Sequence, residues 1–199
     1  MHNSILINRD NPIPSDYQDT VEIVSIAVEE DFSVLLEKET AENYLQLKSY
    51  LSSIGIHVEA LSGYRFQKTQ ERIWNESLAA RGEACTNRYV AKPGHSEHQT
   101  GLAIDLSLYD AQGNMVEDYD TEEYGRIFPH LHKFGFILRY PAGKEDVTGY
   151  PFEPWHIRYV GKEATLRIYE NGWTLEEYVS HGDETPGGRQ WRSACSTGI

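Results

Sequence analysis

An aspartate inside an apolar run is the feature that most restricts how this chain can fold. Residues 101–108, GLAIDLSL, alternate well enough to predict a strand, and Asp105 lies among aliphatic side chains in it. A buried carboxylate is costly unless it is paired or bound to a metal. His98 lies seven residues earlier, and Gly101 lets the backbone turn between the two. This spacing is compatible with a metal site, and also with an aspartate on the polar face of a half-buried strand.

A second motif, EPWH at residues 153–156, adds a further possible ligand and a base. Zinc accepts both imidazole and carboxylate ligands, and catalytic sites usually keep three protein ligands plus water. Alone, the motif is equally consistent with a surface glutamate beside a core tryptophan. Together the two motifs supply one zinc site per chain, formed by His98, Asp105 and His156. Glu153 is then placed to take a proton from water that zinc has acidified to a pKa of about 7.

Two other residues near these motifs are open to more than one interpretation. Arg65 ends SGYR, residues 62–65, at the end of a predicted strand. Its fixed donor fork suits a carboxylate or an oxyanion, although an arginine in a loop is usually just solvated. His95 lies three residues before His98 and is an alternative ligand, which we interpret as a residue of the pocket rim.

Charge and composition narrow the class of partner. The chain of 199 residues has 18 Lys and Arg against 31 Asp and Glu, a net charge of −13. A field of that sign repels phosphate backbones, so no nucleic-acid partner is expected. No stretch reaches transmembrane length, the N-terminus lacks a leader pattern, and the two cysteines form no disulfide framework. We therefore expect a cytoplasmic protein with no membrane segment.

The order of predicted elements indicates an α+β fold. We predict strands at 21–28, 57–63, 101–108, 136–140 and 153–160, and helices at 39–53, 67–81, 121–134, 162–171 and 174–180. The strands are short and do not alternate regularly with helices, which favours a small antiparallel sheet flanked by helices. Residues 1–183 are expected to form one domain, and residues 184–199 a flexible tail.

The joined motifs closely resemble a known family. SxHxxGxAxD, followed some 50 residues later by ExWH and preceded by GYR, is similar to the D-Ala-D-Ala metallopeptidases of the lysostaphin-type and hedgehog-like superfamily. Within it, the VanY carboxypeptidases and the bifunctional VanXY enzymes of vancomycin resistance resemble the chain most. The resemblance extends over roughly residues 5–180, including LINRDNPI, KFGFILRYP and WTLEEY, and it implies the hedgehog-like peptidase fold.

The resemblance implies a role for each matching position. His98, Asp105 and His156 match the zinc ligands, and Glu153 matches the general base. Arg65 matches the arginine that contacts the substrate carbonyl and the developing oxyanion.

The resemblance also implies substrate-binding residues. Ser96 matches the serine that helps to hold the C-terminal carboxylate, Gln70 a glutamine that faces the site, and Trp155 shapes the pocket wall. Phe66 departs from the family, which often has a small hydroxyl residue there, and this puts the substrate contacts at that position in doubt.

The expected reaction is hydrolysis of the peptide bond before a C-terminal D-Ala, in the D-Ala-D-Ala dipeptide or the pentapeptide precursor of the wall. The expected partner is therefore a small peptide that ends in D-Ala. Three alternatives stand beside this expectation: an L,D-carboxypeptidase acting on tetrapeptide stems, an endopeptidase cutting within the stem, and a zinc-bearing binding domain without catalysis.

Overall fold

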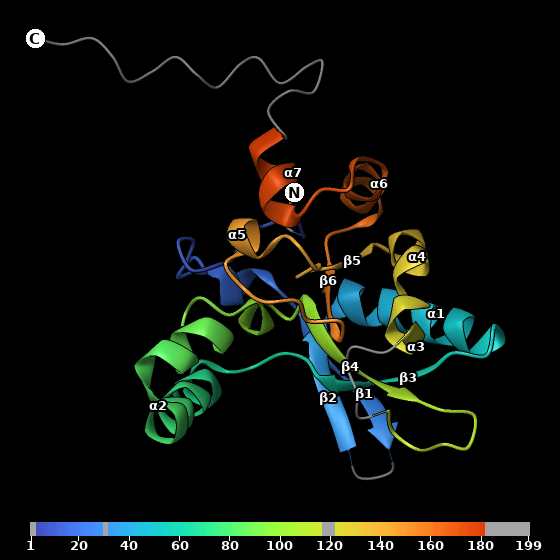
Figure 1. Ribbon diagram of the computed structural model, residues 1–199, viewed down its shortest axis with the longest axis horizontal. Coiled ribbons are helices and arrows are strands. Elements are labelled where there is room, and N and C mark those ends of the chain that lie inside the picture. Colours follow the sequence, from blue (N-terminus) through green and yellow to red (C-terminus); the bar gives the residue numbers. More distant parts are fainter. Residues whose placement is uncertain (1–2, 30–31, 117–121, 182–199) are drawn as a thin grey trace, which may run out of the picture.

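A four-stranded antiparallel sheet lies at the centre of the molecule (Figure 1). The computed structural model describes residues 3–29, 32–116 and 122–181. The sheet has the order β3 (His57–Ser62), β4 (Ala103–Tyr109), β6 (His156–Tyr159) and β5 (Phe136–Leu138). The predicted α+β fold with a small antiparallel sheet is confirmed, whereas the predicted tail at 184–199 lies outside the described residues.

A hairpin of β1 (Ile23–Glu29) and β2 (Phe32–Glu37) forms a second, two-stranded sheet. The sequence predicted no strand at β2. Only Val34 and Leu36 of this strand are buried, and two apolar residues are too few to reveal a strand in the sequence. Pairing with β1 supplies the remaining stabilisation of β2.

Helix α1 (Lys38–Ser53) follows β2 directly and covers the strands. Its N-terminus is capped by Glu37, whose carboxylate accepts hydrogen bonds from the backbone N–H groups of Glu39 and Thr40. One face of α1 packs into the core through side chains spaced three or four residues apart: Ala41, Tyr44, Leu47 and Leu51.

Helix α2 (Gln67–Tyr89) lies on the opposite side of the view from α1 (Figure 1). The sequence predicted an end before Gly82, and Gly82 indeed leaves the helical conformation, with φ of 76° and ψ of 171°. The chain then resumes a helical course to Tyr89, which was not predicted.

Short helices make up much of the rest of the chain. The predicted helix at 121–134 is divided into α3 (Glu122–Gly125), α4 (Phe128–Leu131) and the 3-10 turn η3 (His132–Phe134), with Pro129 in the first turn of α4. The other segments are η1 (Tyr17–Thr20), η2 (Glu97–Thr100), α5 (Glu145–Thr148), α6 (Lys162–Asn171) and α7 (Leu175–His181). None of the helices in the described ranges is long and apolar enough to cross a membrane.

Strand register brings the predicted site residues together. Asp105 in β4 is paired with His156 in β6 on one side and with Ser62 in β3 on the other. The β3–β4 register shifts between Ala60 and Ser62, at the end of β3 that leads to Arg65. Such irregularities often occur next to active sites, where they redirect a side chain.

Gly63, directly after β3, lies where two parts of the structure approach closely. A Cβ atom at this position would lie 2.5 Å from Val34 Cγ1 and would also clash with the Leu35 carbonyl oxygen. That carbonyl accepts a hydrogen bond from the Tyr64 N–H, so β2 holds the loop that carries Arg65.

We therefore predict that Gly63→Ala destabilises the protein by about 1–3 kcal/mol, the usual cost of overpacking a filled site. Gly125→Ala is the matched control, because a Cβ there meets nothing within 4 Å and Gly125 has no left-handed φ. Denaturant unfolding of both variants measures the difference. Equal stability of the two would contradict the close approach at Gly63.

Candidate metal centre

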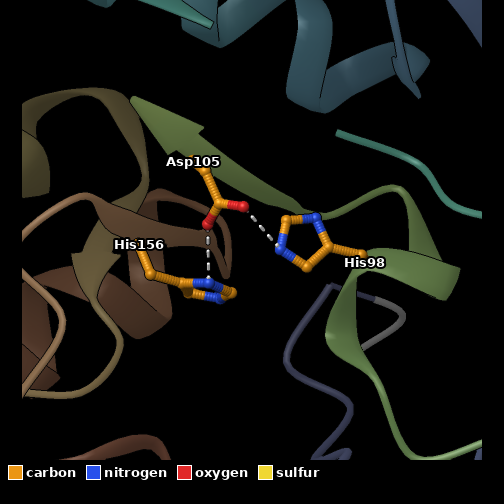
Figure 2. Close-up of side chains that lie close together, drawn as sticks. All are labelled: His98, Asp105 and His156. Atoms are coloured by element: carbon orange, nitrogen blue, oxygen red, sulfur yellow. Dashed lines mark ion pairs between the residues drawn. The ribbon is translucent and has the colours of Figure 1, made fainter. Parts of the chain in front are cut away.

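Three side chains from three elements converge at the middle of the sheet. His98 comes from η2, Asp105 from β4 and His156 from the start of β6. Figure 2 shows the Asp105 carboxylate between the two imidazoles, 3.2 Å from His98 Nε2 and 3.0 Å from His156 Nδ1. Donor atoms of all three lie within 4.8 Å of one another. The structure thus assembles the trio that the sequence predicted.

The hydrogen bonding of His98 favours a cation at the centre of the trio. His98 Nδ1 lies 2.7 Å from the Gly63 carbonyl oxygen, which can only accept, so Nδ1 carries the proton and Nε2 presents a lone pair. Burial and the charge of Arg65 lower the pKa of His98, which keeps the ring neutral. A lone pair that faces the Asp105 carboxylate is repulsive unless a cation lies between them. The donor set therefore fits Zn²⁺.

The other two members of the trio also have properties that suit a cation site. Burial opposes the charge of Asp105, yet the hydrogen bond and the charge of His156 hold the pKa of its carboxyl well below the usual range. Burial likewise opposes protonation of His156, but the Asp105 and Glu97 carboxylates raise its pKa to about 9 in the metal-free chain. The ring of His156 thus binds a proton tightly, and a metal ion competes with protons for such a nitrogen.

Glu153 lies beside the trio without belonging to it. It occupies the segment before β6, and one carboxylate oxygen is 3.7 Å from His156 Nδ1. Burial, and the negative charge of Asp105, raise the pKa of Glu153 to about 7 in the metal-free chain. A carboxylate with a pKa near neutrality exchanges protons readily at physiological pH, as a general base must.

Arg65 also contacts the trio. Its Nη2 donates to Asp105 Oδ2 at 3.1 Å and to Ser62 Oγ at 2.9 Å. The backbone N–H of Arg65 donates to the His98 carbonyl, so the arginine and the histidine loops hold each other. The guanidinium is therefore oriented, which the sequence alone left open.

The eight residues given a role in the zinc site or in substrate binding line one cleft of about 220 Å³: Arg65, Gln70, Ser96, His98, Asp105, Glu153, Trp155 and His156. The buried Gln70 amide donates to the Ala91 carbonyl, and its Oε1 has no partner among the described residues. In this orientation Gln70 offers the cleft an acceptor. His95 is not in this cleft, and its Nδ1 lies 2.9 Å from the Asn8 carbonyl.

The lining residues that were not singled out from the sequence include Glu97, Tyr140 and Tyr150. Tyr140 packs against both the His156 ring and Tyr150, with ring centroids 5.0 Å apart in each pair. Glu97 is buried, and its Oε2 lies 3.6 Å from His156 Nε2. The sequence signal for Glu97 was its position between Ser96 and His98, but a single acidic residue in a loop is usually solvated.

Residues 33–162 match the model of the VanY family, described as D-alanyl-D-alanine carboxypeptidase. The chain is 37% identical over 185 residues to the bifunctional D-Ala-D-Ala dipeptidase and carboxypeptidase VanXYC of Enterococcus gallinarum, covering 90% of this chain and 95% of that protein. It is also 37% identical over 179 residues to the putative carboxypeptidase YodJ of Bacillus subtilis (strain 168). That match covers 87% of this chain but only 65% of YodJ.

Solved structures also match most of the chain. VanY from a VanB-type resistance cassette, in complex with Zn(II), has a TM-score of 0.78 at 34% identity and covers 90% of this chain and 99% of its own. VanYB in complex with D-alanine-D-alanine has a TM-score of 0.76 at 34% identity, covering 90% and 98%. The LdcB LD-carboxypeptidase has a TM-score of 0.74 at 36% identity, covering 90% and 86%.

We predict that the chain binds one zinc ion and that Asp105→Asn largely abolishes binding. The substitution keeps the volume of the side chain but removes the charge between the two histidines. Loss of a residue that only orients a metal ligand lowers metal affinity by roughly 10- to 100-fold, and loss of the ligand Asp105 should lower the zinc affinity by more than that. Calorimetric titration of the metal-free protein measures this. Zinc at about 100 times its Kd should also stabilise the wild-type chain by about 2.7 kcal/mol.

Asp19→Asn, at an exposed aspartate of η1, is the matched control and should bind zinc like the wild type. Unchanged zinc affinity in Asp105→Asn would remove Asp105 from the ligand set.

Proposed function

The chain belongs to the VanY family of D-alanyl-D-alanine carboxypeptidases, and from this premise we propose that it is a zinc peptidase that releases a C-terminal D-Ala from peptidoglycan precursors. Its ligands are His98, Asp105 and His156. The chain spans 65% of the length of YodJ and 95% of that of VanXYC, so the proposal concerns the activity of the region that they share.

One observation carries this proposal. A carboxylate and a guanidinium flank the same metal trio within a single cleft, Glu153 at 3.7 Å from His156 and Arg65 at 3.1 Å from Asp105. A structural metal site needs neither group, because its ligands are already complete. A base and a fixed cation beside a metal are what hydrolysis of an amide requires.

Zinc supplies Lewis acidity at this site, which makes water acidic enough to lose a proton near neutral pH. Glu153 takes a proton from the attacking water as the water oxygen bonds to the carbonyl carbon of the substrate. Glu153 then delivers that proton to the amine nitrogen as the carbon–nitrogen bond breaks, and the amine leaves as D-Ala. The same carboxylate acts first as base and then as acid.

The other cleft residues bind and orient the substrate. Arg65 donates hydrogen bonds to the carbonyl oxygen as it gains negative charge, an interaction that strengthens in the transition state. Ser96 helps to hold the terminal carboxylate, and Gln70 Oε1 accepts a hydrogen bond from an N–H group of the peptide. Trp155 forms part of the wall.

The substrate class follows from the named relatives. VanXYC is called a D-Ala-D-Ala dipeptidase and carboxypeptidase, and VanYB was solved with D-alanine-D-alanine. These support a D,D-bond before the terminal D-Ala, with the dipeptide or the pentapeptide precursor as substrate. We also propose a cytoplasmic location, in which such soluble precursors are encountered, and a link to resistance of the vancomycin type or to wall metabolism.

A second candidate is L,D-carboxypeptidase action on tetrapeptide stems. The specific observation in its favour is the likeness to the LdcB LD-carboxypeptidase, whose 36% identity equals that of the D,D-enzymes within a few per cent.

We predict that Glu153→Ala lowers the rate of D-Ala release by roughly 10²- to 10⁴-fold, the usual contribution of a general acid–base group. The zinc content should not change, because Glu153 is not a ligand. Glu163→Ala, at an exposed position of α6, should retain full activity. Metal analysis and single-turnover D-Ala release test both expectations. A fully active Glu153→Ala variant would show that another group is the base.

We further predict zinc-dependent D-Ala release from the D-Ala-D-Ala dipeptide or the pentapeptide, with slower release from the tetrapeptide. Mass spectrometry of the products, with and without a chelator, measures the three rates. Preference for the tetrapeptide would select the L,D-carboxypeptidase. A zinc-loaded protein that releases D-Ala from none of the three would contradict the proposed function.

A further inference from the structure

A buried network of two arginines and two glutamates lies directly behind the metal trio. Glu97 Oε1 accepts hydrogen bonds from Arg139 Nε at 2.8 Å and from Arg158 Nη1 at 2.6 Å. Arg139 then binds Glu176 of α7 through both terminal nitrogens, at 2.9 and 2.6 Å. Both arginines are completely buried, so the two carboxylates balance their charges within the protein.

The second oxygen of Glu97 is not used by this network. Glu97 Oε2 is buried and has no hydrogen bond to any residue that the structure describes, and the same is true of His156 Nε2. These two atoms lie 3.6 Å apart. The opposite ring nitrogen, His156 Nδ1, faces Asp105 and the centre of the trio. The imidazole of His156 is thus placed between the metal centre and the Glu97 carboxylate.

We propose that Glu97 is a positioning residue for the metal centre: it accepts the Nε2 proton of His156 and so keeps the Nδ1 lone pair directed at the zinc ion. Metal-binding histidines generally donate their second N–H to a carboxylate or carbonyl, which sets the tautomer and orientation of the ring. Glu97 is held by two guanidiniums on its other oxygen. The Glu97 carboxylate therefore has little freedom to turn away from His156.

The same carboxylate links both histidine ligands. Glu97 precedes His98 in η2, and its side chain reaches the second ligand, His156. Arg158 extends the link to the N-terminal segment, donating to the carbonyls of Asn3 and Ile5 at 3.1 and 2.8 Å. Segments outside residues 33–162 thereby support the centre.

Glu97→Gln tests this assignment. The amide has one acceptor oxygen, which the two guanidiniums claim, so its NH₂ group faces His156 Nε2. Two donors then oppose each other, and the imidazole favours the tautomer with its proton on Nδ1, where zinc should bind. We expect zinc to dissociate roughly 10- to 100-fold faster. Stopped-flow transfer of zinc to a chelator measures the rate, and ¹⁵N NMR shifts of His156 report which ring nitrogen carries the proton.

Glu176→Gln is the matched control, because it makes the same change in the same network at a carboxylate that does not face a zinc ligand. It should leave the zinc dissociation rate and the His156 shifts unchanged even if stability falls. Glu97→Asp keeps the charge beside the arginines but withdraws the carboxylate from His156, so it should also release zinc faster. It decides the question if Glu97→Gln fails to fold.

Two outcomes would overturn the proposal: zinc release and His156 shifts in the Glu97 variants that match the wild type, or equal acceleration in Glu176→Gln. The inference rests on the zinc site of the proposed function but on no substrate. A wild-type chain that binds no zinc would instead refute the proposed function itself.

Discussion

The pairing of Asp105 with His156 across neighbouring strands is the constraint on which the rest of the site depends. Antiparallel register places these two residues opposite each other in β4 and β6, on the same face of the sheet. A shift by one residue would turn Asp105 to the other face and leave a carboxylate in the hydrophobic core. The aliphatic neighbours of Asp105, Leu102, Ile104 and Leu106, are all completely buried, so the core itself opposes such a shift.

The loops that complete the centre are held to one another as well as to the sheet. His98 receives its orientation from the Gly63 carbonyl, while the His98 carbonyl receives the N–H of Arg65. Gly101 adopts a left-handed conformation, with φ of 76°, between η2 and β4, and its carbonyl accepts a hydrogen bond from the N–H of Glu37 at the start of α1. Ligand, arginine and helix terminus are therefore positioned by one set of backbone contacts.

Charge in the interior of this protein is concentrated where it can orient a ligand. A buried ion pair is weak evidence for stability, because desolvation offsets much of the attraction. We therefore interpret Glu97 and its two arginines as a rigid support for His156, since their ion pairs join η2, β6 and α7. Preorganisation of this kind holds the donor atoms in place before the metal binds.

Residue types and local spacing made the zinc trio and the base plausible, because each motif keeps its members within a few residues of one another, and the resemblance to the family added the arginine. His98 and Asp105 share one segment, as do Glu153 and His156, and neither pair needs knowledge of the fold. Only the tertiary structure decided that the two segments meet, that Gln70 presents an acceptor and that Glu97 faces His156. Strand β2 was missed for the same reason as Glu97. Strand register and the burial of a charge depend on partners that are distant in the chain, and such partners cannot be identified from the local sequence.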